Sequence, residues 1–95
     1  MIKLTYKTID LLDLVIGMDF KITSPPPLSD EISDKIIRVV LKTLAGICNR
    51  VDIISSKGCI HIAGKFKSAS FYSYHKSARK RIVNIIKLKL RGIHD

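Results

Sequence analysis

A chain of 95 residues is long enough for one small domain, placed here over residues 1–95, and too short for two. With 46% hydrophobic and 26% charged residues it is too apolar for a disordered basic tail and is expected to fold. The net charge of +9 lies entirely in residues 53–95, which hold ten Lys and Arg against one acid, whereas residues 1–52 hold seven against seven. This asymmetry favours a polyanionic partner, with simple solvation of a small basic protein as the alternative.

Cysteine use and hydropathy indicate the compartment. Cys48 and Cys59 lack C-x-x-C spacing and no signal peptide precedes them, so we expect reduced thiols in a cytoplasmic protein. The apolar runs are far shorter than the roughly 20 residues that a membrane-spanning helix needs. We therefore expect a soluble protein with no membrane partner.

The first part of the chain predicts strands. Residues 1–8 alternate apolar and polar side chains, as a half-buried strand does, and residues 19–23 alternate again and should pair with a neighbour. Residues 9–18 fit either a short helical turn or a second strand, and Gly17 would allow the chain to reverse. The role of residues 8–18 stays open.

Three prolines at 25–27 predict a stiff, extended connection before a helix. Ser29 is placed to cap the free amides of that helix, and Asp30 and Glu31 would face the positive end of its dipole. The helix should end near residues 46–49. Its apolar side would consist of Ile36, Val40, Leu44 and Ile47.

Residues 50–66 predict a β-hairpin, because two β-like runs flank "SSKG" and Gly58 can adopt a positive φ. In its second strand the core-facing side chains would be Ile60, Ile62 and Phe66, and those facing away would be His61 and Lys65.

Helical periodicity returns from about Ser68 and ends by Gly92. One side of this helix is apolar and is expected to pack on the sheet; it consists of Phe71, Tyr74, Ala78, Ile82, Ile85 and Ile86. Tyr72 would point away from this side. The opposite side carries four cations, Lys76, Lys80, Lys87 and Arg91, which we call the basic row. Arg79 and Arg81 lie beside this row. The resulting order β(β)αββα predicts an α+β fold, in which a small antiparallel sheet of three to four strands has two helices packed on one face.

The basic row predicts a nucleic-acid site. Cations one helical turn apart repel each other, and no acid at i±4 relieves this repulsion. Phosphate groups of a bound nucleic acid would relieve it. A membrane-surface helix would need its apolar side free, and the core requires that side. The aromatics at 71, 72 and 74 would stack on bases in a single-strand binder, but we expect them to pack in the core or at its rim. The candidate nucleic-acid-binding residues are Lys65, Lys67, Lys76, Arg79, Lys80, Lys87 and Arg91.

Catalytic signals are weak, so we expect no enzyme acting alone, no metal and no cofactor. The three histidines, at positions 61, 75 and 94, lack metal-ligand spacing. Cys59 and His61 share a strand face as a thiol and imidazole would, although ordinary strand residues explain them better. Asp10, Asp13 and Asp19 would cluster near the N-terminal turn, where carboxylates usually cap or solvate. No Gly-rich phosphate loop and no nucleophile elbow occurs.

Two stretches carry a family resemblance. "ARKRIVNIIKLKL" resembles the "LRxxLNSYLRxIxxAL" pattern of the CTAG/Pcc family, the small dimerising subunit of the KEOPS tRNA-modification complex. Arg79 matches the first Arg, Ile82 and Ile86 match apolar positions, and Lys87 stands for the second Arg. "NRVDIISSKGCIHIAGKF" resembles the strand pair of that family, and the layout is similar from residue 19 onward.

The resemblance implies a homodimer, or a heterodimer with a paralogue, joined through the sheets. It also implies helices that pack against an ATPase-type tRNA-modifying subunit and help to hold tRNA during threonylcarbamoyladenosine synthesis. The residues alone leave open a free-standing basic nucleic-acid-binding module without enzymatic activity, or a purely structural partner. A KH-type RNA module would need a G-x-x-G clamp, and this sequence has none.

Overall fold

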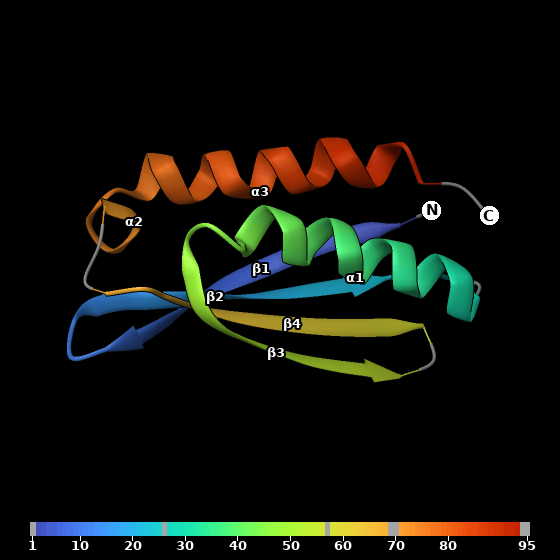
Figure 1. Ribbon diagram of the computed structural model, residues 1–95, viewed down its shortest axis with the longest axis horizontal. Helices are drawn as coiled ribbons and strands as arrows, with labels where there is room; N and C mark the ends of the chain where they lie inside the picture. The colour runs from blue at the N-terminus through green and yellow to red at the C-terminus, as the bar shows by residue number, and fades with distance from the viewer. Residues whose placement is uncertain (1, 26, 57, 69–70, 94–95) are drawn as a thin grey trace.

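The computed structural model describes residues 2–25, 27–56, 58–68 and 71–93, and it shows a four-stranded antiparallel sheet whose helices cover one face (Figure 1). The strand order is β1-β2-β4-β3. The predicted α+β architecture is therefore confirmed. The elements are β1 (Lys3–Leu11), β2 (Leu14–Thr23), α1 (Asp30–Leu44), β3 (Cys48–Ser56), β4 (Cys59–Phe66), α2 (Phe71–Tyr74) and α3 (Lys76–Arg91).

The N-terminal segment is a β-hairpin, so the second-strand alternative for residues 9–18 is the right one. The chain reverses at Leu12 and Asp13, which have φ values of 50° and 64°, rather than at Gly17. Positive φ at both central residues is the conformation of the tight hairpin turn that suits twisted strands. Gly17 lies inside β2, where a Cβ would collide with the carbonyl oxygen of Gly64 on β4. Its role is close approach of two central strands.

Helix α1 begins as the sequence predicts. The Ser29 side chain accepts a hydrogen bond from the Ile32 amide at 3.2 Å, and the helix ends at Leu44, just before the expected range. The Ile32 side chain joins the predicted apolar side, and Ile47 lies half-buried beyond the helix. The buried residues of α1 are Ile32, Ile36, Val40 and Leu44.

The β3–β4 hairpin is also confirmed, with Gly58 at φ +73° in its turn. Strand alternation places Ile60, Ile62 and Phe66 in the core, and Lys65 is exposed. Strands β2 and β4 are the central pair, and five of their side chains have no solvent exposure: Met18, Phe20, Ile22, Ile60 and Ile62.

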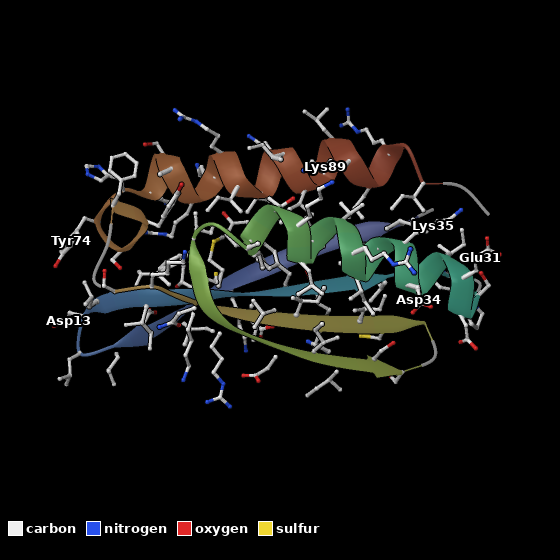
Figure 2. The ribbon with its side chains drawn as sticks, in the orientation of Figure 1. Asp13, Glu31, Asp34, Lys35, Tyr74 and Lys89 are labelled. Carbon is white, nitrogen blue, oxygen red and sulfur yellow. The ribbon has the colours of Figure 1, made fainter. Side chains whose placement is uncertain are left out.

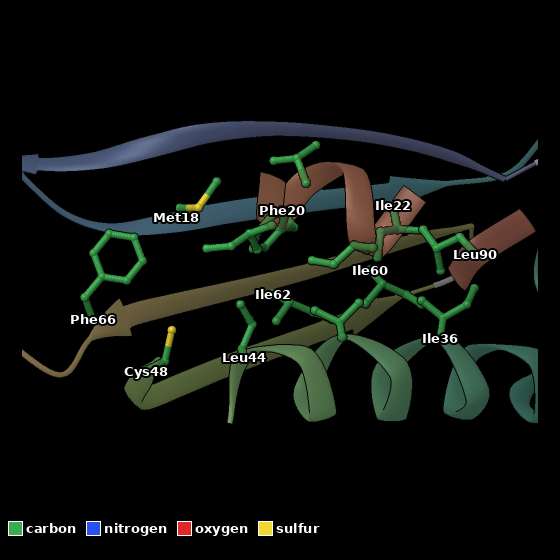
Figure 3. Close-up of a cluster of buried hydrophobic side chains, with 14 of the residues drawn as sticks. Met18, Phe20, Ile22, Ile36, Leu44, Cys48, Ile60, Ile62, Phe66 and Leu90 are labelled. Atoms are coloured by element: carbon green, nitrogen blue, oxygen red, sulfur yellow. The ribbon is translucent and has the colours of Figure 1, made fainter. Parts of the chain in front are cut away.

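The core lies between this pair of strands and the helices (Figure 3). Helix α3 contributes four large apolar side chains, Ile82, Val83, Ile86 and Leu90. Full burial of each such side chain contributes roughly 1.5–3 kcal/mol, which is substantial for a domain with a thin stability margin. The helices are packed on one face only, so the side chains of the other face look into solvent.

The expectation of one helix from Ser68 to Gly92 is wrong. His75 has extended backbone angles, φ −116° and ψ 102°, and it separates α2 from α3; residues 69 and 70 lie outside the described residues. A helical period counted across an extended residue loses its phase. Phe71 and Tyr74 are consequently 60% and 68% exposed, and Tyr72 packs on Phe66 with ring centroids 5.7 Å apart. Ile85 is also partly exposed.

The close approach of β2 and β4 predicts different costs for two Gly→Ala substitutions. Gly17→Ala should lower the free energy of unfolding by about 1–3 kcal/mol, because the new methyl group meets backbone that cannot move aside. Gly46→Ala is the control: nothing lies within 4 Å of its Cβ, so stability should be unchanged or rise by up to about 1 kcal/mol. Urea unfolding midpoints measure both, and equal midpoints would contradict this packing.

Candidate nucleic-acid interface

The rotation of α3 determines where its cations point. The helix buries Ala78 and the four core residues above, and the four members of the basic row are exposed. Lys89 lies on the side facing α1, where its Nζ donates a hydrogen bond to Thr43 Oγ1 at 3.1 Å (Figure 2). Lys87 and Arg91 lie on the side facing β1. At 1.5 Å per residue, the row from Lys76 to Arg91 is about 22 Å long.

A groove of about 480 Å³ separates the end of α3 from the start of β1. Lys3 lines this groove together with Lys87 and Arg91, so a third cation lies at that end of the basic row. The lining residues are Ile2, Lys3, Leu4, Lys87, Leu90, Arg91 and Ile93. Sequence reasoning missed Lys3, because only the tertiary packing of the first strand beside the last helix creates this neighbourhood.

The charges of α3 are not balanced locally. No Asp or Glu occurs between Asp52 and Asp95 in the sequence, so α3 contains no acid of its own. Within the described ranges, the ion pairs within 4.0 Å all lie outside α3: Lys35–Glu31 at 3.8 Å, Arg50–Asp52 at 3.2 Å and His61–Asp19 at 3.9 Å. The basic row therefore presents unneutralised charge, which a polyanion would relieve.

Arg79 differs from the basic row. It is half-buried, and its Nη1 donates hydrogen bonds to the carbonyl oxygens of Tyr72 at 2.6 Å and Ser73 at 3.3 Å. These oxygens lie at the end of α2. The guanidinium thus ties α2 to α3 and holds the chain through the break at His75.

Lys65 lies apart from the basic row, and Lys67 lies just beyond the end of β4. Lys65 pairs with Gly17 of β2 and Arg50 of β3, and alternation along β4 places its side chain on the face opposite the helices. Lys67 follows β4, is exposed, and its amide donates to the Ile47 carbonyl at 3.1 Å. The structure therefore gathers four of the seven candidates on one side of α3 and does not bring Lys65 to them.

The uncovered sheet face is mixed in charge. Lys21 pairs with His61 in the β2–β4 ladder, and the His61 ring lies 3.9 Å from the Asp19 carboxylate. The expected cluster of Asp10, Asp13 and Asp19 does not form, because Asp19 pairs with Lys7, three residues along β1 from Asp10. This face thus offers cations partly offset by acids, unlike the basic row.

The remaining titratable groups give little sign of chemistry. Burial raises the pKa of the Cys48 thiol, and the Lys67 ammonium partly opposes that shift. Across the four described ranges, no group of three or more His, Cys, Asp or Glu side chains is placed to hold a metal ion. In the same ranges, no helix has the length and apolar character needed to cross a membrane.

Comparison with known proteins finds no match for this chain among family models, curated proteins or solved structures.

The Arg79 contacts predict a stability role. Arg79→Ala should lower the free energy of unfolding by about 1–3 kcal/mol, because the partly buried carbonyls of Tyr72 and Ser73 lose a charged donor. Lys80→Ala, one residue on and exposed, should change it by less than about 0.5 kcal/mol. Denaturant titration of both variants measures the difference, and equal effects would exclude an anchoring role for Arg79.

The cysteines should differ in reactivity. Cys59 is partly exposed, whereas Cys48 is buried with a raised pKa, so Cys59 should be alkylated first at mildly alkaline pH. Cys59→Ser should remove the fast phase of alkylation, and Cys48→Ser should remove the slow one. Mass spectrometry of the alkylated protein over time measures both rates. Equal rates for the two thiols would be inconsistent with the burial of Cys48.

Proposed function

We propose that this chain is a non-catalytic accessory subunit that contacts RNA through the basic row of α3. The observation that carries the proposal is the geometry of that row: four exposed cations over about 22 Å, on a helix without acids. Each phosphate that such a cation neutralises releases condensed counterions. Four contacts to a single strand would give a slope of log K against log salt of about −3.

The resemblance to the CTAG/Pcc family supports a more specific form of the proposal. In that form the chain belongs to a cytoplasmic, KEOPS-like assembly, where an ATPase-type partner performs the threonylcarbamoyladenosine chemistry and this chain helps to hold the tRNA. The order of elements from β2 onward, the β3–β4 pair around a short turn and the cations at 79 and 87 agree with it. In this role the chain needs no metal, no cofactor and no turnover of its own.

The sheet edges support the dimer within this proposal. Edge strand β1 carries Lys3 and Lys7 and has an irregularity after Ile9, features that discourage pairing with another strand. Edge strand β3 has apolar side chains at Ile53 and Ile54 that are 37% and 69% exposed. These two side chains lie on opposite faces of the sheet, and a strand paired with β3 would place side chains beside each of them. This pairing is the route we propose for a homodimer or a heterodimer with a paralogue.

A free-standing basic module that reads only backbone phosphate is the second candidate. The observation in its favour is that cations alone form the basic row, and point charges on phosphates carry no sequence information. The two candidates differ in what they bind. The accessory subunit should prefer tRNA over duplex DNA of similar length and be dimeric, whereas the free-standing module should bind both equally.

A competition between tRNA and duplex DNA over a range of salt concentrations, with the mass measured in solution, separates these functions. A preference for tRNA together with a dimeric mass supports the accessory subunit. Equal affinities or a monomeric mass favour the free-standing module. Failure to bind either nucleic acid at low salt would overturn both.

Charge reversal in the basic row should weaken binding. Lys80→Glu combined with Lys87→Glu should reduce RNA affinity at least about tenfold and flatten the salt slope from about −3 to about −1.5, because two of the four phosphate contacts are lost. The matched control is Lys21→Glu with Lys65→Glu, which changes the net charge equally on the uncovered sheet face. Both pairs are exposed, so the fold should persist. Equal losses in the two variants would show that net charge, not the row, governs binding.

A further inference from the structure

The aromatic side chains at the α2–α3 break are presented to solvent. Phe71 is 60% exposed and Tyr74 is 68% exposed, and His75 between the helices is exposed as well. Figure 2 shows Tyr74 pointing away from the body of the domain at its α2 end. We refer to Phe71, Tyr74 and His75 as the aromatic platform. Large exposed aromatics gathered in one place indicate an interaction site more often than chance.

We propose that the aromatic platform stacks on the bases of single-stranded RNA whose phosphates lie along the basic row. This inference rests on the proposed function and names the nucleic-acid class that the site selects. Aromatic faces beside a positively charged track are the combination by which single-strand binders hold bases without sequence preference.

The platform is held in place by its neighbours. Phe71 and His75 are stacked with ring centroids 4.3 Å apart and an interplanar angle of 29°. The Tyr72 ring meets Phe71 edge-on at 5.8 Å and packs against buried Phe66 on its inner side. Together with the Arg79 hydrogen bonds to the end of α2, these contacts hold the Phe71 and His75 rings and the backbone that carries Tyr74 before any ligand arrives. A pre-ordered surface loses little entropy when it binds.

The surrounding charge identifies the partner as an anion. Lys76 follows the platform directly, and Lys80 lies one helical turn further, about 6 Å along the axis. No acid is present in the sequence from residue 53 to residue 94. A nucleic-acid strand whose phosphates contact Lys87, Lys80 and Lys76 would therefore extend to the aromatic platform, where its bases could contact the rings.

The secondary structure of the nucleic acid decides whether the rings can be used. Bases in a duplex are already stacked on each other and paired, so their faces are not accessible to Tyr74, and a duplex would meet the cations alone. Bases of a single strand can turn outward and stack on the rings. The platform should therefore add affinity for single strands and none for duplexes.

The test compares one RNA in two forms. Phe71→Leu and Tyr74→Leu each keep an apolar side chain and remove the aromatic face, and each should weaken binding of a 12-nucleotide uridine-rich RNA roughly tenfold. Binding of the same RNA as a duplex should not change. Tyr74→Phe keeps the aromatic face and should retain single-strand binding, and Leu88→Ala, which removes an exposed apolar side chain of α3 outside the platform, should leave it intact. A single-stranded DNA of the same sequence measures the contribution of the 2′-hydroxyl groups.

The outcomes separate this inference from the proposed function. If the Leu variants bind single strands as well as the original chain does, or lose single-strand and duplex binding alike, the stacking role is overturned. The proposed function still stands in that case if the Lys80→Glu, Lys87→Glu variant loses RNA binding. If the original chain binds neither form at low salt, both are overturned.

Discussion

Burial of the apolar side of α3 against the sheet is the interaction on which the rest of the structure depends. Ile82, Val83, Ile86 and Leu90 pack on the face formed by the central strands, and they fix the rotation of the helix about its own axis. With that rotation set, Lys89 must face α1 and Lys87 must face β1. The direction of the basic row is thus a consequence of core packing, and a helix rotated by one residue would bury cations.

The break at His75 is the second constraint. The extended backbone of His75 separates the helical periods of α2 and α3, so Tyr72 packs against the edge of the core beside Phe66 while Phe71 and Tyr74 remain exposed to solvent. Arg79 stabilises this arrangement because its guanidinium reaches back to the two carbonyls at the end of α2. Arg79, which the sequence analysis placed among the nucleic-acid-binding residues, therefore stabilises the aromatic platform through α2.

Local signals predicted much of this fold, and tertiary contacts account for what they missed. Ser29, Gly58 and the alternation along β4 act within a few residues, so the sequence places them correctly. The turn at Leu12 and Asp13 lacks Gly and Pro, so Asp13 is its one turn-favouring residue, and the break at His75 also lacks both; each was therefore hard to recognise from local residue types. Four of the seven candidate residues form one surface because helical spacing alone fixes their relation. Lys65 falls on the other face and Lys3 was missed because only strand order decides which elements are neighbours.

The exposed side of α3, and not the uncovered sheet face, is the surface that we propose for nucleic-acid binding. Backbone amide NMR during titration with a short single-stranded RNA tests this proposal, because each non-proline residue gives a signal that reports its own environment. The resonances that shift should belong to α2, the first turns of α3 and the positions around Lys87, while those of Lys21, His61 and Lys65 should stay in place. Shifts confined to β2 and β4 on the uncovered face would contradict it.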